Sequence, residues 1–183
     1  DINNVNIASI FATIFIRVLI GPMCDKFGPR NCMAALLLFG SVPIFISSLI
    51  TSAAGLFWCR LCIGTVGGAF VPCQFWTSVM YNKEIVGTAN AFAGGWGNLG
   101  GGFTYIFMPF CFNLFVYAGL TPSLAWRAAI CIPGFIFIIH IIPMLLLAWS
   151  SPHSKQWKPM VEEHGVKIKS GEGFKAAVTS STV

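Results

Sequence analysis

The sequence predicts an all-α membrane protein with about five transmembrane helices. Of its 183 residues, 56% are hydrophobic and only 9% are charged, whereas a soluble domain carries roughly a quarter charged residues. The apolar runs are about 20 residues long, the length that a helix needs to cross a bilayer and about twice that of a barrel strand. Because backbone groups in hydrocarbon must be hydrogen-bonded within the protein, runs of this length are expected to be helical.

The predicted spans follow one another with short connections. The first begins in a polar stretch with three asparagines, and the fourth is long and rich in glycine. They are residues 3–24, 32–51, 56–81, 85–117 and 125–149. We therefore expect residues 1–149 to form a transmembrane unit. Residues 150–183 are polar and basic, and we expect them to form a largely unstructured cytoplasmic linker.

The basic residues give the orientation of the spans. Lys26 and Arg30 follow the first span, Lys83 follows the third, and several lysines lie in the tail, whereas 52–55 and 118–124 contain no Lys or Arg. Lys and Arg concentrate on the cytoplasmic side, so the chain is predicted to start outside and to end inside. An odd number of spans in this orientation predicts one further helix before Asp1, and no signal peptide is evident.

Neither the cysteines nor the net charge predicts a metal site, a redox site or a nucleic-acid partner. Cys59 and Cys62 form a C-x-x-C pair, a spacing found in metal and redox sites. No second pair or nearby His completes such a site, so all seven cysteines are expected to be free thiols, with no metal or cofactor. The net charge of +5 is explained by the cytoplasmic connections and predicts no nucleic-acid partner.

A ten-residue motif follows the first predicted span. Its G-x-x-x-D-x-x-G-x-R pattern places Gly21, Asp25, Gly28 and Arg30 in the predicted cytoplasmic loop. Gly21 permits close approach of a helix, and Gly28 permits a tight turn. Asp25 is able either to pair with Arg30 or to cap a nearby helix N-terminus. The ordinary alternative is a charged loop.

A second motif, AGGWGNLGGG at residues 93–102, lies inside the fourth span. Gly97 and Gly101 form a small-xxx-small pair, as do Gly64 and Gly68, and such pairs let helices pack closely. Packing and substrate contact are both open for the six glycines. Asn98 is a polar amide within an apolar span and needs a partner, either a neighbouring helix or an anion. The glycines are Gly94, Gly95, Gly97, Gly100, Gly101 and Gly102.

Arg17 is the main candidate for binding a ligand. It precedes Asp25 by eight positions, which places it about 12 Å deeper in the membrane. An arginine near the bilayer centre costs about 3 kcal/mol on insertion scales, so it requires a partner. That partner is either an acid outside this chain or a bound anion, and no Asp or Glu lies within the predicted spans. Gln74 either faces the cavity that would hold the anion or is packed against neighbouring helices.

These motifs resemble those of a known family. The first is similar to the hallmark of major facilitator transporters, and the second resembles the nitrate signature of eukaryotic nitrate/nitrite porters. Residues 1–4, 70–76, 87–91 and 125–127 also resemble plant, algal and fungal members. The resemblance implies that 1–149 are helices two to six of a six-helix N-terminal half. It also implies that the first motif is a cytoplasmic gate.

The same resemblance implies a function. Members transport nitrate and nitrite by alternating access, in eukaryotes with protons, at the plasma membrane, and some need an accessory subunit. Arg17 matches a nitrate-binding arginine on the second helix, and Asn98 and Gln74 are the further substrate-binding candidates. A C-terminal half absent from this chain is expected to supply a second arginine. The alternative is a major facilitator transporter for another small anion or solute; no catalytic constellation indicates an enzyme.

Overall fold

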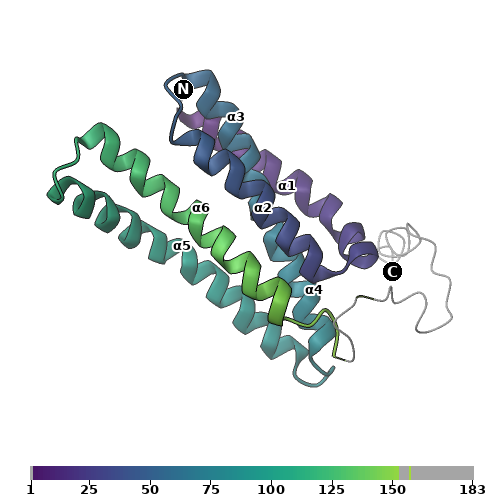
Figure 1. The fold of residues 1–183 in the computed structure, drawn as a ribbon. Coiled ribbons are helices and arrows are strands. Elements are labelled where there is room, and N and C mark those ends of the chain that lie inside the picture. The colour runs from purple at the N-terminus through teal and green to yellow at the C-terminus, as the bar shows by residue number, and fades with distance from the viewer. Residues whose placement is uncertain (1, 153–156, 158–183) are drawn as a thin grey trace.

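The computed structural model describes residues 2–152 and Trp157. Every regular element in this part of the chain is a helix (Figure 1). In order they are α1 (Ile2–Phe27), α2 (Pro29–Ser47), α3 (Ala53–Gly64), the 3₁₀ helix η1 (Thr65–Ala69), α4 (Phe70–Met80), α5 (Val86–Tyr117) and α6 (Pro122–Leu147).

The five predicted spans are confirmed for the described residues. Five helical segments are long and apolar enough to cross a membrane: Asn6–Phe27, Pro29–Ser47, Ala53–Met80, Val86–Tyr117 and Pro122–Leu147. Their ends differ from the predicted ends by a few residues. The last helix begins at Pro122 rather than at 125 because Thr121 is extended and proline suits the first helical position.

The hydrophobicity of the third span predicts one continuous α-helix, but the structure shows an interrupted one. It consists of α3, the five-residue η1 and α4. Pro72 has no N–H to donate to the carbonyl of Gly68, and the neighbouring glycines have little preference for α-helix. The backbone therefore tightens into a 3₁₀ turn in the middle of the span. Hydrophobicity alone does not reveal such a break.

The helices form a bundle around α2. α2 packs against α6 and α3, α1 packs against α3 and η1, and α5 packs against α4 and α6. α1 and α5 lie on opposite sides of this bundle (Figure 1). Half of the α2 span is buried, compared with 6% of the α5 span. Large apolar side chains cover the outside, as expected for surfaces that face lipid or further helices.

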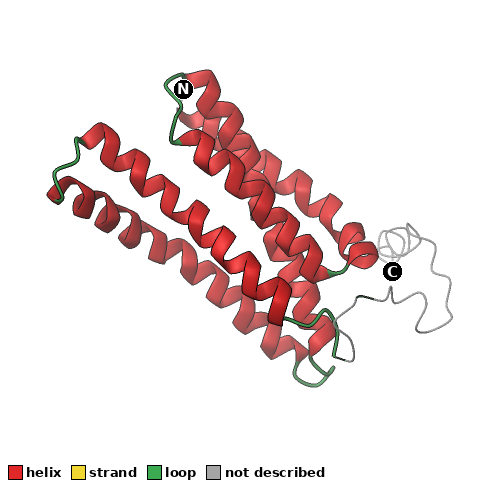
Figure 2. Cartoon of the chain, viewed as in Figure 1, coloured by secondary structure: helices red, strands yellow, loops and turns green. Residues whose placement is uncertain are grey.

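The connections lie at two ends of the bundle (Figure 2). Residues 48–52 and 118–121 lie at one end, and Gly28, residues 81–85 and residues 148–152 lie at the other. The basic residues Lys26, Arg30 and Lys83 are all at this second end, which is the arrangement that the loop charges predicted. Of the predicted linker 150–183, only residues 150–152 and Trp157 fall within the described residues.

Candidate functional site

The site is built on a close contact between α1 and the third span. A Cβ atom added at Gly67 would lie 2.7 Å from the Thr13 side chain, and one at Gly68 would lie 2.7 Å from Cγ2 of Ile16. At Gly64 it would collide with the backbone carbonyl of Ser9. The packing role predicted from the spacing of Gly64 and Gly68 is therefore confirmed.

Side chains of α1 bond to carbonyls of this contact. The Thr13 hydroxyl lies 2.6 Å from the carbonyl oxygen of Gly64 and 2.9 Å from that of Ser9. One turn further along, Nε of Arg17 donates to the carbonyl oxygen of Gly67 at 3.2 Å. The 3₁₀ turn does not use its carbonyls in a regular α-helical ladder. α1 therefore supplies two side-chain donors to the break in the third span.

Arg17 lies in the middle of its span. It comes 11 residues after Asn6 and 10 before Phe27, the two ends of that span. Its guanidinium carbon is 5.5 Å from the centre of the Phe70 ring, a cation–π distance. Nε is the nitrogen that bonds to Gly67, and the terminal nitrogens make no hydrogen bond to any described residue. Arg17 is exposed in the described part of the chain.

Gln74 joins α4 to α5. Its Nε2 donates to the carbonyl oxygen of Asn90 at 3.2 Å, and Nδ2 of Asn90 donates to the Ser78 hydroxyl at 2.8 Å. A Cβ atom at Gly94 would lie 3.3 Å from Nε2 of Gln74 and 3.6 Å from the Phe70 ring. Phe70 thus lies against both Arg17 and the glycine-rich helix, so α4 connects Arg17 with the second motif.

Asn98 is not brought to this cluster by a direct contact. It is exposed and forms no hydrogen bond with the described part of the chain. It lies four residues after Gly94, so the two share one face of α5. Among the described residues, nothing lies within 4 Å of a Cβ placed at the other five glycines of this motif. Their predicted roles in packing or in substrate contact stay predictions.

The first motif differs in conformation from the predicted loop. α1 continues through Asp25 to Phe27, and α2 begins at Pro29, so Gly28 alone separates the two helices. Gly28 has φ of 84°, a conformation that favours glycine. Nη1 of Arg30 donates to the carbonyl oxygen of Ala148 at 3.0 Å, which ties the motif to the end of α6. No described atom lies within 4 Å of a Cβ at Gly21.

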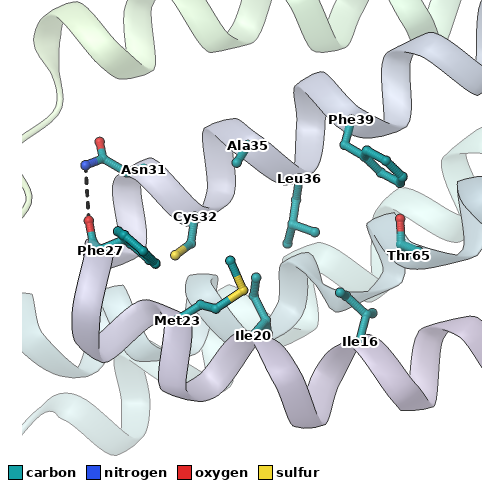
Figure 3. A pocket seen from close by; sticks show the side chains of 10 residues that line it. All are labelled: Ile16, Ile20, Met23, Phe27, Asn31, Cys32, Ala35, Leu36, Phe39 and Thr65. Atoms are coloured by element: carbon teal, nitrogen blue, oxygen red, sulfur yellow. Dashed lines mark hydrogen bonds between the residues drawn. The ribbon is translucent and has the colours of Figure 1, made fainter.

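A groove of about 540 Å³ lies between α1 and α2 (Figure 3), and Arg17 is not among its described lining residues. Ile20, Met23, Leu36 and other apolar side chains line it. Its one amide side chain, Asn31, donates to the carbonyl oxygen of Phe27 at 3.1 Å. No Lys or Arg is among the described residues that line the groove, so it is suited to a lipid tail or an apolar side chain rather than to an anion.

All seven cysteines are free thiols in the structure. Within the described residues, no group of three or more His, Cys, Asp or Glu side chains is placed to hold a metal ion. Cys59 and Cys62 are one helical turn apart on α3, and Cys59 is buried.

Sequence reasoning did not identify Phe70 or Asn90 as members of this cluster. Phe70 is one of 17 phenylalanines, and only the contact with Arg17 distinguishes it. Asn90 lies in the first part of α5, near the predicted cytoplasmic end, and its Oδ1 is buried without a partner among the described residues. A signal was present for Asn90, since it is a polar amide sixteen residues from Gln74 across a short connection.

The fold and the cluster define a multi-pass, all-α membrane protein with a cation at the centre of one span. The family model of the Major Facilitator Superfamily matches residues 2–182. The chain belongs to this superfamily, whose members are transporters rather than enzymes.

Several curated proteins are similar to this chain. "High affinity nitrate transporter 2.5" of Arabidopsis thaliana is 40% identical over 157 residues, which are 86% of this chain and 31% of that protein. "Nitrate transporter 2.1" of Chlamydomonas reinhardtii is 36% identical over 169 residues, 92% of this chain and 31% of that protein. "Nitrate/nitrite transporter NrtP" of Nostoc punctiforme is 28% identical over 182 residues, 99% of this chain and 36% of that protein.

This chain spans about a third of the length of the curated relatives that it matches. No solved structure matches it significantly.

Proposed function

We propose that this chain takes part in the transport of nitrate, and of nitrite, across a membrane. The observation that carries the proposal is the position of Arg17. Its guanidinium lies at mid-span over the Phe70 ring, and the terminal nitrogens are not bonded to any described residue. The names of the relatives, which are nitrate or nitrate/nitrite transporters, point to the same anion.

The chemistry of the two groups is complementary. Nitrate is a small, planar anion with a single charge, and guanidinium is a planar cation with forked donors, so the two are able to form paired hydrogen bonds. The bond from Nε to the carbonyl of Gly67 holds the plane of the guanidinium. Phe70 provides an apolar wall that excludes water from one side, which strengthens the electrostatic attraction.

Gln74 and Asn98 extend the proposed site along α4 and α5. Gln74 is held beside Gly94 by its bond to Asn90. Asn98 lies on the same face of α5 one turn from Gly94, where its amide is free to donate to an anion. Gly95, Gly97 and the later glycines provide a smooth surface beside Asn98, against which another helix is able to slide.

The wider mechanism belongs to the same proposal. Residues 1–149 serve as helices two to six of an N-terminal bundle, and a second bundle encloses the anion from the other side. Alternating access then arises from rocking of the two bundles around the midplane. We further propose proton coupling, a plasma-membrane location and, in some settings, an accessory subunit. Residues 1–183 alone are accordingly expected not to carry nitrate into liposomes.

The substitution Arg17→Lys tests the site. Lysine keeps the charge but loses the planar fork. Loss of one charge-assisted hydrogen bond amounts to about 1.5–3 kcal/mol, which corresponds to an increase of about 10- to 150-fold in the apparent KM for nitrate. Uptake of labelled nitrate is measured in cells that express the protein at its natural length, with surface expression determined in parallel.

The matched control is Arg60→Lys. Arg60 is exposed on α3, a helix that lies at the opposite end of the bundle from the α1–α2 connection (Figure 1). This variant is expected to retain the nitrate KM. A normal KM in Arg17→Lys removes Arg17 from the site. Uptake of a different small anion that depends on Arg17, with no nitrate uptake in the unmodified protein, indicates the alternative substrate class.

A further inference from the structure

Trp157 lies against the connection between α1 and α2. A Cβ atom placed at Gly28 would be 2.7 Å from Cβ and Cγ of Trp157, so the indole occupies the face where a side chain would otherwise lie. Nε1 of Trp157 donates to the carbonyl oxygen of Asp25 at 2.9 Å. The ring also meets Phe75 of α4 edge to face, with centroids 5.7 Å apart. One side chain thus contacts three separate groups.

The sequence of the connection explains why an indole fits there. The helical donor for the carbonyl of Asp25 would be the N–H four residues later, but that residue is Pro29, which has none. The carbonyl of Asp25 therefore needs a donor from outside the helix, and Nε1 of Trp157 supplies it. Gly28 has a positive φ and no side chain, which leaves space for the ring.

Two further bonds attach the segment after α6 to the same end of the bundle. Arg30 donates to the carbonyl of Ala148 at 3.0 Å, and Nε1 of Trp76 donates to the carbonyl of Trp149 at 2.9 Å. These bonds reach α2 and α4, while Trp157 reaches α1 and α4. Ala148, Trp149 and Trp157 therefore connect α1, α2 and α4 at their predicted cytoplasmic ends.

We propose that Trp157 is a latch on the predicted cytoplasmic gate. It holds the α1–α2 connection against α4, and this end of the bundle opens only when the indole leaves Gly28. Phe75, which the indole touches, directly follows Gln74 and lies five residues after Phe70. Movement at the latch is therefore transmitted along α4 to the cluster around Arg17. The latch does not depend on the identity of the transported solute.

Native cysteines report the state of the latch. Cys24 and Cys32 flank the connection and are buried, with exposed fractions of 0% and 3%. Cys59 and Cys111 are also buried, at 8% and 5%, and serve as references from α3 and α5. The rate of labelling by N-ethylmaleimide is measured for each cysteine by peptide mass spectrometry, in membrane vesicles that contain the protein at its natural length.

Trp157→Ala is expected to raise the labelling rates of Cys24 and Cys32 by about 5- to 30-fold, the factor that corresponds to a change of 1–2 kcal/mol in an opening equilibrium. The rates of Cys59 and Cys111 are expected to stay within about twofold, because local opening does not reach them. Trp157→Phe keeps the ring contact but loses the donor, so it is expected to give an intermediate increase. Gly28→Ala displaces the indole and is expected to give the same pattern.

Trp126→Ala is the matched control, since Trp126 is the fifth residue of α6, at the other end of the bundle. This variant is expected to leave the labelling rates of Cys24 and Cys32 unchanged. Unchanged labelling of these two thiols in Trp157→Ala overturns the latch. An equal rise at all four cysteines also overturns it, because it shows general loosening. If the Trp157→Ala protein fails to insert into the membrane, the cysteine labelling rates of Trp157→Phe and Gly28→Ala are judged by the same criteria.

Discussion

The third span and α5 carry similar glycine spacing in opposite surroundings. Gly64 and Gly68 are four residues apart, as are Gly97 and Gly101. The first pair faces α1 so closely that a single added carbon would collide with Ser9 or approach Ile16 at 2.7 Å. The second pair has no described atom within 4 Å. The spacing therefore predicts a surface suited to close approach, but it does not identify what approaches.

This contrast distinguishes glycines that the described fold requires from glycines that it does not require. At Gly64, the absence of a side chain is required for the fold of the described helices. At Gly97, nothing in the described residues requires it, so a glycine-rich motif there implies a contact made outside them. Substitutions at the two places are expected to differ in what they damage.

The largest effect is expected for Gly64→Leu. Its Cβ alone would overlap the backbone of α1, and backbone cannot rotate away as a side chain does. Overpacking of this kind costs about 1–3 kcal/mol even where side chains adjust, so we expect at least the upper end of that range and loss of correctly folded protein. Yield and melting temperature in detergent measure it. A normal melting temperature would contradict the close contact between α1 and α3.

Gly97→Leu sharpens the contrast. Because space is open around Gly97, the melting temperature of residues 1–183 is expected to change by less than about 2 °C, the effect of a surface substitution. Nitrate uptake by the protein at its natural length is expected to be lost, as it is for Gly101→Leu, because a partner helix would be pushed away. Normal uptake in both variants would show that this face meets nothing in the working protein.

Thr13→Val removes a polar contact but preserves shape. The hydroxyl bond to the carbonyl of Gly64 is lost, and hydrogen bonds between membrane helices contribute about 0.6 kcal/mol on average and up to about 1.7. A decrease within that range is expected in the free energy of unfolding. Thr104→Val is the control, since its hydroxyl bonds only within α5. An equal decrease in the free energy of unfolding in both variants would mean that the bond to Gly64 does not stabilise the fold.

Asn98→Ala is expected to have the smallest effect on the fold. Asn98 is exposed and bonds to no described residue, so the melting temperature of residues 1–183 should be unchanged. In the working protein, the KM for nitrate is expected to rise by about 5- to 10-fold through loss of one hydrogen bond. Loss of expression comparable to Gly64→Leu would assign Asn98 to the packing of the protein instead.

Much of the fold is predictable because hydrophobic length and loop charge act locally. Five apolar runs and the alternation of Lys26, Arg30 and Lys83 are enough to place the spans and their ends. The 3₁₀ turn at Thr65–Ala69 is not predictable in this way, because it leaves hydrophobicity unchanged. The sequence predicts a loop at Asp25 for a related reason, because a charged residue does not reveal that α1 continues to Phe27.

The candidate site is predictable only in part. Arg17 stands out because a charge at mid-span is costly. Phe70 does not, because apolar side chains are ordinary in a membrane helix and its position depends on packing between α1 and α4. The role of Trp157 also depends on contacts across more than a hundred residues of sequence. Such contacts have no periodicity that a sequence pattern could reveal.

The bonds from Thr13 and Arg17 to the third span have a consequence for how this sequence can evolve. Both acceptors are main-chain oxygens, those of Gly64 and Gly67. A point mutation does not delete a main-chain oxygen, so a change of side chain along η1 does not by itself remove the acceptor that anchors Arg17. The orientation of the guanidinium therefore depends mainly on the backbone conformation, and few side chains are needed to preserve it.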